Sequence, residues 1–226
     1  MKRSVTAYDD VAAAYGRALD PEGAGLVDPV LTELVGEVAG RHVLSLACGQ
    51  GQDARLLALL GAAVTGIDVS EEMLRRAREH EKADPRGIAY VHDDAQALAQ
   101  LGSASFDGVV CHMALMDIPD LAQALGAVAR VLRDEGWFVF SIVHPCYHPH
   151  VEIAEDYLVD HRYLKLRPPD WLPPHAYHRP LAAYVNELAS TGLRLERVVE
   201  QHTPGRPDDV GGVPGLLYAR AVKRSD

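Results

Sequence analysis

The stretch Val43-Leu-Ser-Leu-Ala-Cys-Gly-Gln-Gly51 is a short apolar run that ends in two glycines. The run predicts a buried β-strand, and the pattern from Asp53 to Leu60 after it is helical. Glycines at such a strand-to-helix turn let the backbone approach a ligand closely. Asp68 lies 19 residues after Gly49 and ends the next predicted strand, where a carboxylate can accept hydrogen bonds from both ribose hydroxyls. The segment therefore predicts a nucleoside-binding βαβ unit.

Strand and helix patterns continue to alternate on both sides of this unit. Strand patterns occupy residues 63–67, 88–92, 106–111 and 136–143, and helical patterns occupy residues 71–80 and 121–132. Such alternation predicts a parallel sheet with helices on both faces, a doubly wound, Rossmann-like α/β fold. A helix at 181–190 and strands at 193–199 and 216–222 follow, with Gly211-Gly212 and Pro214 between the strands. We expect these last two strands to form an antiparallel pair at one edge of the sheet.

Two segments are expected to cover the core. Apolar residues at helical spacing predict a helix over 4–19, and a second helix is expected from about Val27 to Val38, closed at Gly40. Residues 144–180 hold seven of the fourteen prolines and six of the eleven histidines, so we expect no regular structure there and interpret the segment as a lid. The predicted organisation is one domain, 1–226, with a helical cap (1–40), a cofactor-binding core (41–144), a lid (145–179) and a closing helix and strands (180–226).

Composition excludes several classes of partner. The 226 residues carry 22 Lys and Arg against 32 Asp and Glu, a net charge of −10, which disfavours nucleic acid and anionic membranes. No apolar run approaches the roughly 20 residues of a membrane span, and the charged start is unlike a signal peptide. Three cysteines without a CxxC pair indicate a reducing compartment, so we expect a cytoplasmic protein with a small-molecule substrate, as a monomer or homodimer.

Further motifs occur in the same order along the chain as in a known family. They are Tyr8-Asp-Asp-Val-Ala-Ala-Ala-Tyr15, His92-Asp-Asp-Ala95, the strand from Phe106 to Asp117, and Val131-Leu-Arg-Asp-Glu-Gly-Trp-Phe-Val-Phe140. With the glycine-rich turn and Asp68, they resemble the class I S-adenosylmethionine-dependent methyltransferases, of the small-molecule, ubiquinone-biosynthesis-like type. The sequence departs from that family at Ser45 and Ala47, where Asp and Gly are more usual, and at Asp134-Glu135, which replace Pro-Gly.

The resemblance implies S-adenosylmethionine as cofactor and S-adenosylhomocysteine as product. Asp68 would hold the ribose, Val69 would pack on the adenine, and Asp94 would meet the adenine amino group, although the neighbouring Asp93 is an alternative. Tyr15 would touch the methionine end. The residues expected at the cofactor are Tyr15, Ala47, Gly49, Gly51, Asp68, Val69, Asp94, Ala95 and Cys111.

Methyl transfer is an in-line displacement that demands alignment and exclusion of water, so no catalytic side chain is obligatory. A base helps where the nucleophile starts protonated, and histidine suits that task. We consider His144, directly after the fifth strand, His112, at the mouth of the fourth, and His178; a structural hydrogen bond is the alternative for His144. The residues expected to contact the substrate are Tyr8, Met113, Met116, Tyr147, His148 and Tyr177. We expect no metal site.

The function predicted is transfer of a methyl group from S-adenosylmethionine to an O or N atom of a small molecule, a planar or amphipathic compound of the kind found in secondary metabolism. Methylation of a carbon on a quinone-like ring is one alternative, and a non-catalytic module that binds S-adenosylmethionine is another. A nicotinamide-dependent reductase is disfavoured because the turn lacks a third glycine and Asp53 would repel a diphosphate.

Overall fold

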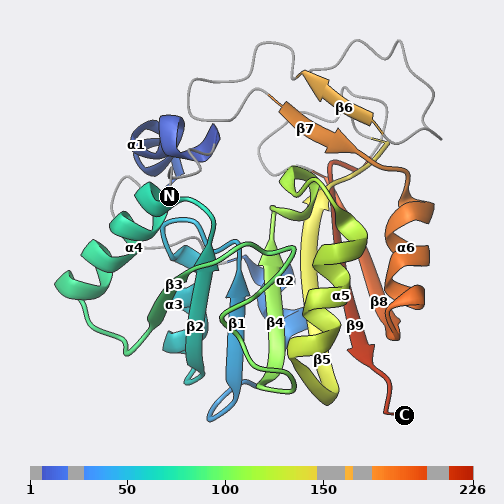
Figure 1. Cartoon of the computed structure of the whole chain (residues 1–226), viewed down its shortest axis with the longest axis horizontal. Coiled ribbons are helices and arrows are strands. Elements are labelled where there is room, and N and C mark those ends of the chain that lie inside the picture. The colour runs from blue at the N-terminus through green and yellow to red at the C-terminus, as the bar shows by residue number, and fades with distance from the viewer. Residues whose placement is uncertain (1–6, 20–27, 147–160, 165–174, 203–213, 226) are drawn as a thin grey trace.

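A seven-stranded sheet in the order β3-β2-β1-β4-β5-β9-β8 forms the centre of the molecule (Figure 1). The structure is a computed structural model that describes residues 7–19, 28–146, 161–164, 175–202 and 214–225. The strands of the sheet are β1 (His42–Leu46), β2 (Ala63–Asp68), β3 (Ala89–His92), β4 (Phe106–His112), β5 (Leu132–Val143), β8 (Leu193–Gln201) and β9 (Leu216–Lys223).

The pairing of the strands confirms the predicted doubly wound fold. Strands β1 to β5 run parallel, β9 is antiparallel to β5, and β8 is antiparallel to β9. Strand β1 pairs with β2 on one side and with β4 on the other, so the chain reverses its direction of winding at this point. In open α/β sheets, ligands bind at the carboxyl ends of the strands beside such a reversal.

Helices cover both faces of the sheet, and each face has its own apolar core. One core includes the buried sides of α5 (Leu121–Val131) and α6 (Leu181–Ser190). The other includes α2 (Pro29–Val35) and α3 (Gln52–Leu59), which lie behind the sheet in Figure 1. Helix α4 (Glu71–Ala83) follows β2. Burial of the central strands on both faces explains their continuous apolar sequences.

Three elements lie above the carboxyl ends of the parallel strands. Helix α1 (Ala7–Leu19) lies over α4, the short helix η1 (Leu115–Asp117) follows β4, and strands β6 (His161–Leu164) and β7 (His175–His178) form an antiparallel pair (Figure 1). The expectation that no regular structure runs through residues 145–179 is therefore wrong for β6 and β7. All the prolines of this region lie outside the two strands, so each strand keeps its backbone donors.

The ends of some elements also differ from the sequence predictions. Helix α2 ends at Val35, because Gly36 takes a positive φ of 71° and donates its N–H to the Thr32 carbonyl. Gly40 lies instead in the turn before β1, where its N–H bonds the Gly61 carbonyl. Strand β5 begins at Leu132 rather than near Gly136, directly after α5.

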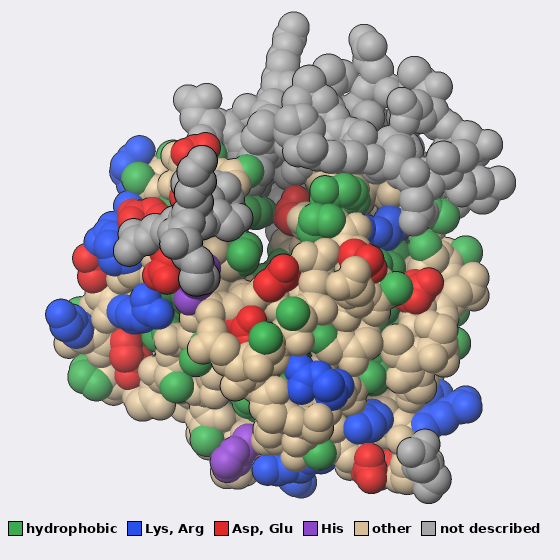
Figure 2. All heavy atoms as spheres, viewed as in Figure 1, with side chains coloured by type: hydrophobic (Ala, Val, Ile, Leu, Met, Phe, Trp, Pro, Cys, Tyr) green, Lys and Arg blue, Asp and Glu red, His purple; other side chains and the backbone are tan. Residues whose placement is uncertain are grey.

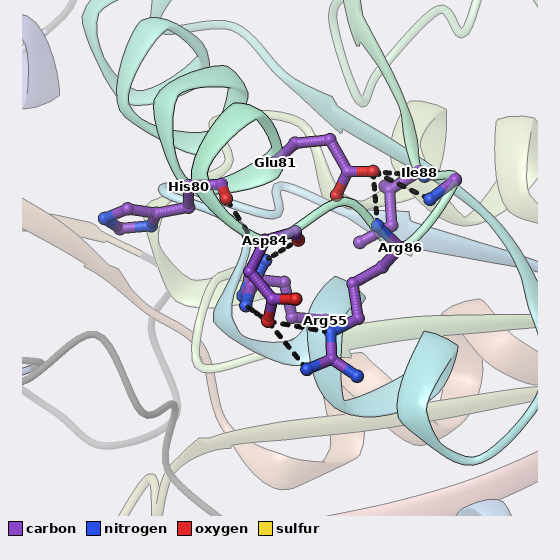
Figure 3. A network of polar contacts seen from close by, with 7 residues as sticks. Arg55, His80, Glu81, Asp84, Arg86 and Ile88 are labelled. Carbon is purple, nitrogen blue, oxygen red and sulfur yellow. Dashed lines mark hydrogen bonds and ion pairs between the residues drawn. The ribbon is translucent and has the colours of Figure 1, made fainter.

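A polar network joins α3 to the end of α4 (Figure 3). Arg55 of α3 donates to the Asp84 carboxylate at 2.8 Å, and Arg86 donates to the same carboxylate at 2.7 Å. Glu81 accepts backbone N–H bonds from Arg86, Gly87 and Ile88 with one oxygen. The network fixes the turn that leads into β3.

Gly108 of β4 provides a test of the packing between β4 and β5. It pairs with Trp137, and a methyl group at Gly108 would overlap the indole ring. We expect Gly108→Ala to lower the free energy of unfolding by about 1–3 kcal/mol because overpacking forces the ring or the strands to move. Gly126→Ala in α5 is the matched control. A methyl group there meets nothing within 4 Å, so helix propensity should raise stability by about 0.5–1 kcal/mol. Urea denaturation measures both, and similar effects at the two sites would contradict this packing.

Candidate active site

The glycine-rich turn between β1 and α3 has an unusual backbone. Ala47, Gly49 and Gly51 all have positive φ angles, of 52°, 53° and 89°. A Cβ atom at Gly49 would point into open space, whereas one at Gly51 would overlap the Tyr90 ring of β3. Gly49 is thus the glycine that leaves room for a ligand. Gly51 is required by packing and by its left-handed conformation at the start of α3.

Asp68 lies beside this turn, as its position in the sequence predicts. One carboxylate oxygen accepts the Gly49 N–H at 2.8 Å, and the other accepts the Ser70 N–H at 2.8 Å. Burial raises the pKa of Asp68 above its ordinary value, against the lowering effect of these N–H groups. Each oxygen keeps a second lone pair, so the fixed carboxylate can still accept bonds from two neighbouring hydroxyls.

The carboxyl ends of β2 and β3 carry the residues predicted at the adenine. Val69 is 39% exposed although it is apolar, and Ala95 is buried. Asp93 is buried and accepts bonds from the N–H groups of Asp94 and Gln100. The Asp94 side chain is exposed, and among the described residues its carboxylate accepts only from Gln96, so it is the carboxylate of the pair that can meet a ligand.

Helix α1 is attached on two sides of the strand ends. On one side, Asp9 accepts hydrogen bonds from the Ser70 hydroxyl at 2.6 Å and from the Glu72 N–H at 3.2 Å, at the start of α4. On the other, the Tyr8 hydroxyl donates to the Asp117 carboxylate of η1 at 2.8 Å. The ring of Tyr15 meets that of Tyr8 edge to face, with 6.1 Å between centroids. Tyr8 and Tyr15 therefore share the underside of this cap.

A glycine lets α1 approach the glycine-rich turn. A Cβ atom at Gly16 would lie 2.7 Å from the side-chain oxygen of Gln50, which is 2% exposed. A larger residue at Gly16 would require the buried Gln50 side chain or α1 to move. The sequence pattern of α1 did not reveal this contact, because Gln50 carries no periodic signal.

Three carboxylates from separate elements surround the same region. Burial raises the pKa of the Tyr15 hydroxyl, and the negative charges of Asp53, Asp117 and Asp68 raise it further. The thiol of Cys111, fully buried at the end of β4, has its pKa raised by burial and by the same three carboxylates. These three carboxylates therefore lie close enough to α1 and to the end of β4 to act on both groups.

His112 at the end of β4 lies between the carboxylates of Asp53 and Asp28. Its Nδ1 is 3.1 Å from Asp53 Oδ1, and its Nε2 is 3.6 Å from Asp28 Oδ2. Asp28 also accepts the Tyr218 hydroxyl at 2.7 Å and the Leu31 N–H at 2.9 Å. Burial is the largest single influence on the pKa of His112 and lowers it, but Asp53 and Asp28 together raise the pKa above its ordinary value.

The other two histidines considered as bases are both buried. His144 is 4% exposed; its Nδ1 accepts the Cys146 N–H at 3.1 Å, so its Nε2 carries the hydrogen and donates to Glu200 at 2.9 Å. Both of its nitrogens are engaged, which is the geometry of a structural hydrogen bond. His178 is 5% exposed in β7. His112 contacts Asp53, a carboxylate of the site, at 3.1 Å, whereas His144 contacts Glu200.

The residues predicted to contact a substrate divide into three groups. Met113 follows β4 with a positive φ of 55°, held by bonds from its N–H to Ser141, and Met116 in η1 packs against the core. Tyr177 is half-buried with the Arg179 guanidinium 5.2 Å from its ring centre. Tyr147 and His148 lie outside the described residues.

Arg179 is a site residue that the sequence did not indicate. It is 5% exposed, and its guanidinium donates to the carbonyls of Leu115, Ile118 and Pro119 at 2.6–3.2 Å. It therefore fixes η1, which carries Asp117, to the end of β7. Its partners lie about 60 residues away in the chain, so no local pattern could identify it. The same holds for Asp28, whose partner Tyr218 is 190 residues away.

Three further observations concern the surface, metal ligands and membrane-spanning helices. Acidic and basic side chains are interspersed over α4, at the left edge of Figure 2, where Arg75 pairs with Glu72 at 2.7 Å. Within the described ranges, no group of three or more His, Cys, Asp or Glu side chains is placed to hold a metal ion. None of the helices in this part of the chain is long and apolar enough to cross a membrane.

Comparison with known proteins defines the family. A model of the methyltransferase domain matches residues 44–140. A ubiquinone biosynthesis O-methyltransferase of Paracidovorax citrulli is 40% identical over 106 residues, which are 46% of this chain and 44% of that protein. The chain spans about half the length of the curated relatives it matches.

Solved structures match over more of the chain. An S-adenosylmethionine-dependent methyltransferase from Mesorhizobium loti is 31% identical, with a TM-score of 0.73 over 86% of this chain and 96% of that one. A Burkholderia thailandensis 1,6-didemethyltoxoflavin-N1-methyltransferase, solved with S-adenosylhomocysteine, shares the fold at 18% identity, with a TM-score of 0.62 over 94% of this chain and 81% of that one. The chain belongs to the S-adenosylmethionine-dependent methyltransferases.

The raised pKa of His112 predicts a dependence of stability on pH. A histidine with a raised folded pKa stabilises the fold fully below its unfolded value of about 6.5, and this contribution is lost as pH rises through the folded value. We therefore expect the stability advantage of the wild type over His112→Gln to be larger at about pH 5.5 than at about pH 8.5. Urea denaturation at both pH values measures it. A stability advantage of the wild type that grows with pH would show that Asp53 and Asp28 do not stabilise the protonated imidazole of His112.

Proposed function

We propose that this protein transfers a methyl group from S-adenosylmethionine to an oxygen or nitrogen atom of a small molecule. The observation that carries the proposal is the group of carboxylates, Asp53, Asp68 and Asp117, beside the open space at Gly49. S-adenosylmethionine carries a sulfonium and an ammonium group, so nearby carboxylates favour its binding. The same carboxylates would repel the diphosphate of a dinucleotide.

The residues present fit this cofactor. Asp68 is fixed by two backbone N–H groups and keeps lone pairs for the ribose hydroxyls, and Gly49 leaves space next to it. Val69 offers an exposed apolar surface for the adenine, beside the exposed carboxylate of Asp94. When bound, S-adenosylmethionine supplies an electrophilic methyl group for in-line displacement.

The protein itself contributes alignment and exclusion of water. Helix α1, held by the contacts of Asp9 and Tyr8, closes the region above the strand ends. His112 is the candidate for a base that takes a proton from a hydroxyl acceptor, because its Nε2 lies 3.6 Å from Asp28, beyond hydrogen-bond distance, while its Nδ1 contacts Asp53. His144 positions the segment after β5 through its two hydrogen bonds.

The relatives favour oxygen as the acceptor atom. The curated matches are named ubiquinone biosynthesis O-methyltransferases, and they match this chain over 106 to 108 residues, about half of its length. A hydroxyl acceptor is supported by these relatives. A cytoplasmic protein without a nucleic-acid partner remains our prediction from charge and cysteine content.

Calorimetric titration with S-adenosylhomocysteine, beside NADH, tests the proposal. We expect the wild type to bind the homocysteine nucleoside and not NADH. Asp68→Ala should weaken binding by about 100-fold, because two charge-assisted hydrogen bonds to the ribose are lost. Screening hydroxyl and amine compounds for methyl transfer would then identify the acceptor. Binding of NADH without a response to S-adenosylhomocysteine would overturn the proposal.

A further inference from the structure

We infer that Asp53, positioned by His112, binds the ammonium group at the methionine end of the cofactor. This assignment rests on the proposed function, because it concerns the same cofactor site. The sequence raised Asp53 only as a charge that disfavours diphosphates. Its place in the fold gives it a specific partner.

The order of the strands places the methionine end near Asp53. The adenine residues Val69 and Asp94 follow β2 and β3, and the ribose carboxylate Asp68 ends β2. In the sheet order β3-β2-β1-β4, the ends of β1 and β4 follow those of β3 and β2, so we place the remaining part of the nucleoside toward β1 and β4. Asp53, in the first turn after β1, and His112, at the end of β4, lie there.

The surroundings of Asp53 show that its carboxylate faces this region. It contacts His112 of β4, and it contributes the largest effect of any charge on Tyr15 of α1 and on Cys111 of β4. Its side chain is 21% exposed. A cation between α1 and the strand ends therefore meets Asp53.

The hydrogen bonds of the nearby carboxylates distinguish Asp53 from its neighbours. Asp68 accepts from Gly49 and Ser70, and Asp28 accepts from Leu31 and Tyr218. Among the described residues, Asp53 bonds His112 with Oδ1 alone, which leaves Oδ2 for a donor from outside the protein.

His112 fixes the carboxylate through a chain of contacts. Tyr218 of β9 donates to Asp28, Asp28 lies 3.6 Å from one nitrogen of His112, and Asp53 lies 3.1 Å from the other. The chain is anchored in the sheet and at the start of α2, because Asp28 caps that helix. His112 is thus a positioning residue for Asp53 in cofactor binding.

Two nucleosides that differ only at the methionine end test the assignment. S-adenosylhomocysteine carries the amino acid group, and 5′-methylthioadenosine lacks it. By calorimetry, we expect Asp53→Asn to lower the affinity for S-adenosylhomocysteine by about tenfold or more, because one charge-assisted hydrogen bond is lost. The affinity for 5′-methylthioadenosine should stay within about twofold of the wild-type value. Asp84→Asn, which removes an equal charge in the turn after α4, is the matched control and should change neither affinity.

His112→Asn is the second variant and should also weaken S-adenosylhomocysteine alone. Equal affinities of Asp53→Asn and the wild type for S-adenosylhomocysteine would overturn the assignment. Equal losses for both nucleosides would also overturn it, because they would show a general structural role. If the wild type binds neither nucleoside, the proposed function itself fails. If the wild type binds both and Asp68→Ala binds neither, the cofactor site is intact. In that case, a failure of Asp53→Asn to distinguish the two nucleosides overturns this inference alone.

Discussion

Strand β1 is hydrogen-bonded to β2 on one side and to β4 on the other, and the site depends on this double pairing. Because all three strands are parallel, their carboxyl ends meet at one edge of the sheet. The glycine-rich turn, Asp68 and His112 each follow one of these ends. A single bond from the Gly49 N–H to Asp68 then joins the first two ends directly. Without this reversal of winding, residues 49, 68 and 112 would not be neighbours.

Each carboxylate at these strand ends is fixed in place by a hydrogen-bond donor. Backbone N–H groups hold Asp68, a tyrosine hydroxyl holds Asp117, and an imidazole holds Asp53. These donors come from the turn, from α1 and from β4. Assembly of the site is therefore coupled to docking of α1 through Tyr8 and Asp9. A cationic ligand would neutralise part of the charge of these carboxylates. Because α1 contacts Asp117, we expect ligand binding and docking of α1 to depend on each other.

Residues 145–179 illustrate where sequence patterns lose their value. Their many prolines indicated irregular backbone, yet β6 and β7 pair there because the prolines fall between and beside them. Arg179 follows β7 and binds three carbonyls of the segment around η1, which no spacing could reveal. Similarly, Gly36 rather than Gly40 closes α2, because local signals identify glycines that permit a left-handed turn but not which one the packing selects.

The sequence by itself determined the alternation of strands and helices, the glycine-rich turn and the acid that ends β2, because these depend on local periodicity and on spacing within one βαβ unit. The antiparallel edge strands were also predictable from the turn residues before β9. Only the tertiary structure decided which histidine meets a carboxylate of the site. Asp28, Asp53 and His112 are brought together by the sheet order and by Tyr218, 190 residues from Asp28. Contacts across such distances arise from packing of whole layers, and no local pattern in the chain encodes them.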